Sequence, residues 1–185
     1  MNYENTVKIS GLVHFTGRKK DQKYFPFSIR HENLWSDGTT RKDFLDVRAF
    51  NPDLQEKLKT LDENALVEIS GILRSSKGSG ELYLAANEIN ALDKIEALEN
   101  KVNLTGYVHV IKAQNEGETG TGKYIRFAVR QENDAGKEFL TVRVYDEALR
   151  KILESKNDGE PVEVEGTLRS SRGSGVNYVR CSNLK

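Results

Sequence analysis

The sequence predicts an all-β protein of two tandem five-stranded barrels, each with a short helix between strands three and four. Three observations lead to this prediction. The chain has 185 residues, which suits one large or two small domains. A ten-residue segment that begins at Gly71 recurs at Gly166, an offset of 95 residues. Each copy also contains short stretches of alternating apolar and polar residues, as half-buried strands require.

The repeat extends well beyond this segment. GILRSSKGSG in the first copy becomes GTLRSSRGSG in the second, and Gly11 and Gly106 match at the same offset. The offset rises to 100 at Phe27 and Phe127 and returns to 95 at Phe44 and Phe139. The second copy therefore has five more residues between its first two strands and five fewer before its third. We expect these length differences to lie in surface loops.

Each element of the first copy follows from its pattern. Alternation predicts strands over residues 7–15, 24–30 and 44–50, and Gly11 permits a bend or bulge in the first of them. Pro52 and a cap at Asn51 or Asp53 predict a short helix, and two more strands follow at residues 67–69 and 82–89. The second copy repeats this order with Asp146 as the helix cap. We expect domains at residues 5–92 and 102–185, joined by a short helical connector at 93–101.

Composition excludes several classes of protein. Hydrophobic residues make up 37% of the chain and no apolar run is long enough to span a membrane. The single cysteine, Cys181, excludes an internal disulfide framework and a cysteine-rich zinc site, and three scattered histidines do not suggest a metal centre. With no leader at the start, we expect a cytoplasmic protein with no cofactor, no metal and no membrane partner.

Charge alone does not identify the partner. Lys plus Arg and Asp plus Glu both total 28, so the net charge is zero, whereas most nucleic-acid-binding domains are basic. A zero total is compatible with a basic groove opposite an acidic face. Acidic residues gather on the first predicted helix and the connector, which favours that arrangement.

The outward face of the third strand is the most informative feature. If Leu45, Val47 and Ala49 point inward, then Phe44, Arg48 and Phe50 point outward. The second copy repeats this set as Phe139, Arg143 and Tyr145. Exposed rings beside a guanidinium are typical of a surface that stacks unpaired bases. The alternative is that a strongly curled barrel tucks these rings under a loop or a partner subunit.

The neighbouring elements extend this surface. The second strand presents aromatic and basic residues that would lie beside the third strand, although ordinary solvated surface explains them equally well: Tyr24, Arg30, Tyr124, Arg126 and Arg130. The Ser/Gly-rich hairpins carry basic residues suited to phosphate oxygens, or they are simply soluble turns: Arg74, Lys77, Arg169 and Arg172.

Three further aromatic residues are candidates for the same surface. Tyr83 and Tyr178 match in the fifth strands, and Trp35 lies in the long loop of the first copy, where it would contact a base or another protein. His14 and His109 also match, but without nearby ligand partners we expect structural or surface roles for them.

The order of strands and helix is that of the OB fold, a small partly open barrel. The segments FSIR at 27–30, FLDVRAF at 44–50 and VEISGILR at 67–74 resemble the bacterial and phage single-stranded DNA-binding protein family, here in two tandem copies. In that family, aromatic residues of strand three and a tryptophan after strand two stack on bases. By position the resemblance implies this role for five residues: Phe44, Phe50, Phe139, Tyr145 and Trp35.

The chain also departs from the family pattern. The family usually ends in a flexible acidic tail that recruits other enzymes, whereas this chain stops at Lys185, so we do not expect that role. The family also gathers four barrels from four chains. Two barrels in one chain imply a homodimer with the same number of barrels, with a monomer as the alternative.

The leading hypothesis is a non-enzymatic protein that coats single-stranded DNA during replication, recombination or repair, for example in a phage or mobile element. One alternative is an assembly module that binds proteins of a primosome-like complex, and another is an RNA-binding barrel. The sequence shows no Ser/His/Asp set, metal-ligand cluster or P-loop, so we expect neither an enzyme nor a small-molecule substrate.

Overall fold

A computed structural model of the chain describes residues 2–17, 22–34, 37–94, 98–109, 116–119 and 122–185. The elements of this part follow in the order β1 (Asn5–His14), β2 (Phe25–Leu34), β3 (Thr40–Ala49), α1 (Pro52–Lys59), β4 (Leu66–Ser75), β5 (Leu82–Ala91), β6 (Asn100–His109), β7 (Glu116–Thr119), β8 (Gly122–Asn133), β9 (Gly136–Val144), α2 (Glu147–Glu154), β10 (Pro161–Ser170) and β11 (Asn177–Leu184). The described helices include none long and apolar enough to cross a membrane.

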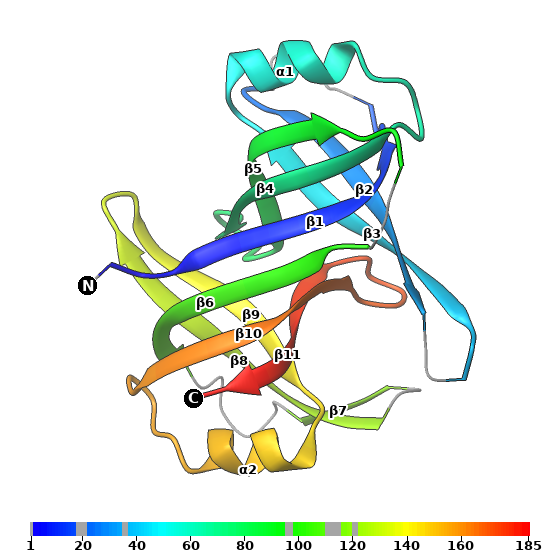
Figure 1. Cartoon of the computed structure of the whole chain (residues 1–185). Helices are drawn as coiled ribbons and strands as arrows, with labels where there is room; N and C mark the ends of the chain where they lie inside the picture. The colour runs from blue at the N-terminus through cyan, green and yellow to red at the C-terminus, as the bar shows by residue number, and fades with distance from the viewer. Residues whose placement is uncertain (1, 18–21, 35–36, 95–97, 110–115, 120–121) are drawn as a thin grey trace.

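The strands form two barrels that share one continuous sheet (Figure 1). Barrel 1 contains β1–β5 and α1, and barrel 2 contains β6–β11 and α2. In barrel 1 the first strand pairs with both β4 and β2, and β3 pairs in parallel with β5, which closes the sheet on itself. Barrel 2 repeats these pairings. The predicted fold class, two tandem barrels with a helix after each third strand, is confirmed.

Antiparallel pairing of β1 with β6 joins the barrels. Val7 lies opposite Val102, which is its own equivalent in the second copy. Hydrogen bonds beside this pair are also repeated, because Ser10 N donates to Glu99 O and Thr105 N donates to Glu4 O, both at 2.9 Å. Each barrel therefore contributes the same strand edge to the junction.

The core lies inside the barrels, on the inward faces that alternation predicts. Leu45, Val47 and Ala49 of β3 are fully buried, as is Phe27 of β2. The helices cover the far ends of the two barrels (Figure 1). Asn51 caps α1 by accepting a hydrogen bond from Asp53 N, which decides between the two caps that the sequence allowed.

Asp146 caps α2 by accepting a hydrogen bond from Leu149 N, as predicted.

In barrel 1, the backbone of Gly11 lies close to that of Arg30, because a Cβ at Gly11 would come within 2.6 Å of Arg30 O. The bulge lies instead in β4, between Ser70 and Gly71, and in β10, between Glu165 and Gly166. A Cβ would lie 2.2 Å from Ala85 O at Gly71 and 2.2 Å from Arg180 O at Gly166, so both bulges leave room for glycine alone.

The connector differs from its prediction. Of the expected helix at 93–101, the described residues 93–94 and 98–99 lie in neither helix nor strand, and Asn100 and Lys101 already belong to β6. Residues 95–97 lie outside the described residues. Pairing with β1 starts at Asn100, opposite Ile9, so a sheet contact in space overrides the helical spacing of the sequence.

The hairpins are longer than predicted, and this brings the barrels into contact. β3 begins at Thr40 instead of residue 44, and β4 continues to Ser75. The β2–β3 hairpin reaches alongside barrel 2, and the β8–β9 hairpin reaches alongside barrel 1 (Figure 1). The additional residues of the second copy were expected in a loop, but part of them forms β7, which pairs with β8.

Candidate nucleic-acid interface

The aromatic residues of β3 and β9 face away from the barrel cores. Phe44, Phe50 and Phe139 are 47%, 44% and 36% exposed, and Tyr145 is half-buried. The barrels do not curl enough to seal these rings inside, so the pleat direction predicted from alternation is right. We call Tyr24, Phe44, Arg48 and Phe50 platform 1, and Tyr124, Phe139, Arg143 and Tyr145 platform 2.

In platform 1, Arg48 lies among the aromatic rings. Its guanidinium carbon is 4.0 Å from the centre of the Tyr83 ring and 5.0 Å from that of Tyr24. The rings of Tyr24 and Phe50 are 5.3 Å apart, which makes a partly open cluster on the outward surface. Phe50, at the outer edge of this cluster, is 44% exposed and so offers ring surface to a base.

Platform 2 repeats this geometry. The guanidinium carbon of Arg143 is 3.9 Å from the centre of the Tyr178 ring and 4.8 Å from that of Tyr124. Tyr124 and Tyr145 are 5.2 Å apart. Arg180 of β11 adds a second cation 4.5 Å from the Tyr145 ring.

Tyr83 and Tyr178 have a supporting position. Their exposed fractions are only 8% and 3%, and each ring lies next to the arginine of its platform. Burial raises the pKa of both phenols. The structure therefore places them beneath the surface, where they orient Arg48 and Arg143 and offer little area to a base.

Sequence reasoning missed the two matched histidines as neighbours of the platforms. The His14 ring lies 5.6 Å from that of Phe44, and His109 lies 4.8 Å from Phe139. His14 Nδ1 is 2.6 Å from Glu63 Oε1, and the hydrogen bonds that Glu63 receives from Phe15 N and His14 lower the pKa of its carboxyl. His109 similarly lies 3.3 Å from Asp158. The signal was present in the sequence, since both the histidines and their acidic partners match at the 95-residue offset.

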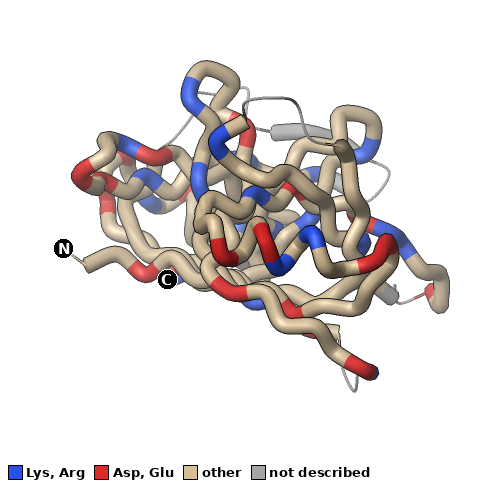
Figure 2. The backbone as a smooth tube through the Cα atoms, turned by 90° about the horizontal axis from the view of Figure 1, so that it is seen from above, with Lys and Arg blue, Asp and Glu red and all other residues tan. Residues whose placement is uncertain are grey.

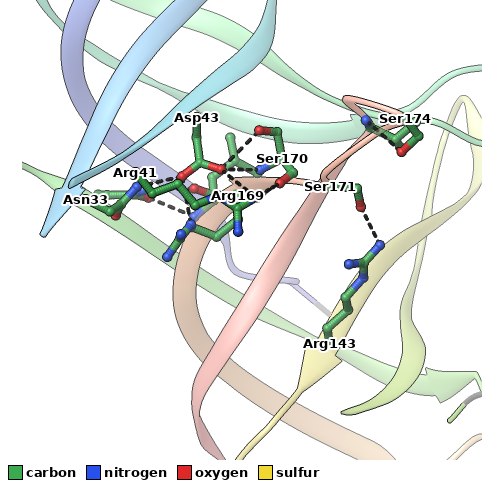
Figure 3. Close-up of polar contacts among 11 residues, drawn as sticks. Asn33, Arg41, Asp43, Arg143, Arg169, Ser170, Ser171 and Ser174 are labelled. Atoms are coloured by element: carbon green, nitrogen blue, oxygen red, sulfur yellow. Dashed lines mark hydrogen bonds and ion pairs between the residues drawn. The ribbon is translucent and has the colours of Figure 1, made fainter. Parts of the chain in front are cut away.

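The two predicted phosphate-binding arginines at the hairpin bases have another role. Arg169 Nε is 2.9 Å from Asp43 Oδ2, and Asp43 also accepts hydrogen bonds from Ser170 N and Ser170 Oγ (Figure 3). Asp43 belongs to β3 of barrel 1, whereas Arg169 and Ser170 belong to β10 of barrel 2. We call this set the Asp43 clamp. Arg169 is thus buried against a carboxylate, which corrects its prediction as a phosphate contact.

An equivalent clamp lies on the other side of the junction. Glu138 of β9 accepts from Arg74 Nε at 2.7 Å, from Ser75 N at 2.8 Å and from Ser75 Oγ at 2.7 Å. Burial alone would raise the pKa of Glu138, but these hydrogen bonds outweigh it and leave the pKa below its ordinary value. Arg74, like Arg169, is committed to this inter-barrel contact, which we call the Glu138 clamp.

Beyond the clamps, the tips of the hairpins are exposed and basic. Lys77 and Arg172 are exposed, and the matched glycines of the tips share left-handed backbone, with φ of 93° at Gly78 and 88° at Gly173. Seen from above, two loops with basic residues project from one side of the molecule, and several acidic residues lie along the opposite side (Figure 2). Phosphate contact at Lys77 and Arg172 therefore stays a prediction, whereas Arg74 and Arg169 at the hairpin bases pair with carboxylates.

Three of the remaining predicted residues, Arg30, Arg126 and Arg130, lie around the platforms. Arg30 is 4.0 Å from Glu32 and opposite Phe44 in the β2–β3 ladder, and Arg130 is 3.7 Å from Glu132 and opposite Phe139. Arg126 is exposed and lies opposite Arg143. Trp35 lies outside the described residues.

Comparison with known proteins supports the architecture. No protein-family model and no curated protein matches this chain. The wild-type single-stranded DNA-binding protein from Thermus aquaticus has a similar structure, with a TM-score of 0.77 and 18% identity over 100% of this chain and 93% of that chain. A deletion mutant of the same protein gives 0.76 and 18% over 99% and 94%. The tandem OB architecture implied by the resemblance is therefore confirmed at the level of fold.

Proposed function

We propose that this protein binds single-stranded DNA with little preference for sequence, as a non-enzymatic coat in replication, recombination or repair. Bases stack on the rings of platforms 1 and 2, and the phosphates lie beside the exposed cations. The observation that carries this proposal is the outward aromatic–arginine–aromatic set, present in both barrels on a surface that the cores do not use.

The chemistry supports stacking better than recognition of base edges. Rings and guanidinium planes contact any base through its π-face, and each stacked base contributes ~1–3 kcal/mol. A protein described as a single-stranded DNA-binding protein has a similar fold over both barrels, which supports single-stranded DNA as the ligand.

Titration of labelled oligo-dT, followed by fluorescence anisotropy, tests the proposal. Replacing one exposed ring in each platform, in the double variant Phe44→Ala with Phe139→Ala, should weaken binding by ~1–3 kcal/mol for each ring that holds a base. Ile152→Ala is a matched control, because Ile152 is also a large exposed apolar residue but lies on α2. It should bind like the wild type.

The same titration separates the alternatives. Competition with oligo-U of equal length would favour an RNA-binding role if RNA displaced DNA efficiently. No binding even at low salt would reject the nucleic-acid proposal and favour the assembly module. The mass of the complexes gives the number of chains that hold one oligomer.

A further inference from the structure

A groove runs between barrel 1 and the turn that joins β8 to β9 of barrel 2. Its volume is about 530 Å³, and one wall consists of platform 1 residues, including Arg48 and Phe50. The opposite wall includes Lys137 and Phe139, which come from barrel 2. Residues of both barrels thus form one concave surface.

The Glu138 clamp fixes the distance between the two walls. Glu138 neighbours Lys137 and Phe139 in β9, while Arg74 and Ser75 lead directly into the hairpin of barrel 1. Its three hydrogen bonds of 2.7–2.8 Å hold that hairpin against the β9 strand. The groove is therefore a built feature of the chain.

The groove has the charge that a phosphate backbone requires. Lys77 and Lys137 are exposed at its lining, and Glu138, the acidic residue of this lining, is neutralised by Arg74. Lys137 lies 3.7 Å from Glu132, an exposed surface pair that a phosphate oxygen can readily replace. Aromatic rings at both walls accompany these cations.

Building on the proposed function, we propose that one DNA strand crosses between the barrels through this groove. It leaves platform 1 at Phe50, passes its phosphates over Lys77 and Lys137, and reaches Phe139 of platform 2. Lys137 is then a binding residue for DNA held by the other barrel. The tandem arrangement is required because barrel 1 alone lacks one wall of its own site.

Oligomers of different length test this path. An oligo-dT of about 8 nucleotides fits a single barrel, whereas one of about 30 nucleotides can span both. The informative quantity is the gain in affinity from the shorter to the longer oligomer, measured with the full chain. In the double variant Lys77→Glu with Lys137→Glu, the gain should fall roughly tenfold or more, because like charges then repel the strand at the crossing.

Lys57→Glu with Lys101→Glu is the control for total charge. Both residues are exposed and neither lines the groove, so this variant should keep the wild-type gain in affinity. The milder pair Lys77→Ala with Lys137→Ala should reduce the gain less and should lower the salt dependence for the long oligomer by ~0.7 per lost phosphate contact.

The outcomes are distinct. If the groove variant binds both oligomers and its affinity rises from the shorter to the longer one as much as in the wild type, the proposed path is wrong. The proposed function then stands. Equal loss in the groove variant and its charge control would also overturn the path, since the effect would then come from net charge. Failure of wild-type protein to bind either oligomer would instead reject the proposed function.

Discussion

The two barrels share a scaffold, yet their platforms differ in charge. Arg48 of platform 1 lies 3.3 Å from Asp46. Burial raises the pKa of the Asp46 carboxyl, although the neighbouring guanidinium acts in the opposite direction. In platform 2, Thr141 stands at the position equivalent to Asp46, and Arg143 donates to Ser171 Oγ instead (Figure 3). Asp46 thus offsets the positive charge of Arg48 in platform 1, whereas Thr141 does not offset that of Arg143 in platform 2.

Two more differences between the copies also add positive charge beside platform 2. Arg126 replaces Pro26, and Arg180 replaces Ala85, both next to platform 2. We infer that barrel 2 holds DNA more tightly and with a steeper salt dependence than barrel 1. The repeat preserves the aromatic rings and varies the surrounding electrostatics.

The clamps also differ, although their hydrogen-bond pattern is the same. The side chains of Asp43 and Arg169 are 0% and 7% exposed, whereas those of Glu138 and Arg74 are 10% and 30% exposed. Asp43 is further contacted by Asn33 and Arg41. Because the Asp43 clamp is the more buried of the two, breaking it should lower the free energy of unfolding more than breaking the Glu138 clamp.

The largest expected effect is on stability. Asp43→Ala leaves Arg169 buried without its carboxylate and should destabilise the fold by about 3–5 kcal/mol. Glu138→Ala exposes Arg74 to water and should cost only about 1–2 kcal/mol. Urea unfolding of both variants measures the difference, and equal losses would show that the two clamps are equivalent.

Next in size is the contribution of each arginine to binding. Arg143→Ala should lower affinity for a long oligo-dT by about tenfold, and Arg48→Ala by about threefold, because Asp46 already offsets Arg48. Anisotropy titrations at one salt concentration compare the two, with thermal melts as the control for folding. A larger loss for Arg48→Ala would reverse our ranking of the barrels.

Asp46→Thr should make platform 1 resemble platform 2. Arg48 then loses its acidic partner and can donate to Ser76 Oγ, a buried hydroxyl without a hydrogen bond to any described residue. We expect affinity to rise by about threefold. Asp93→Thr, which removes an exposed acid elsewhere, is the control, and an equal rise in both would assign the effect to net charge alone.

The smallest effect concerns pH. His31 is buried at the base of the β2–β3 hairpin with Nδ1 2.7 Å from Ser10 O, and burial lowers its pKa below the ordinary value of 6.5. Asp43, Glu32 and Arg169 are the charged groups that face it. Because the folded-state pKa is depressed, the neutral ring is favoured above about pH 6.5, and stability falls as pH decreases from there.

His31→Gln tests this contribution with the residue that barrel 2 uses, since Gln131 is its equivalent. The variant should lose less stability than the wild type between about pH 7 and about pH 5. Parallel pH profiles for wild type and His31→Gln would contradict the assignment.

The sequence predicted what depends on alternation within one strand. The period of two placed Phe44 and Phe50 outward because Leu45 and Val47 must be inward, and the structure confirms this. Helix caps and the fold class also followed from local signals.

It did not predict contacts between segments that are distant in the chain. Asp43 and Glu138 occupy inward positions of their strands, and a carboxylate on a core face signals a buried partner. Nothing local identifies that partner as an arginine of the other barrel. The prediction of a helical connector was wrong for the same reason, because only the spatial position of β1 makes Asn100 the start of a strand.

The pairing of β1 with β6 has a consequence for any directional polymer. Because Val7 lies opposite its own equivalent in an antiparallel ladder, a half-turn relates one barrel to the other. A straight chain with 5′ and 3′ ends would meet the first platform in one polarity and the second in the reverse. DNA that satisfies both platforms with the same polarity must therefore curve back on itself, so the protein would impose a bend on the strand it covers.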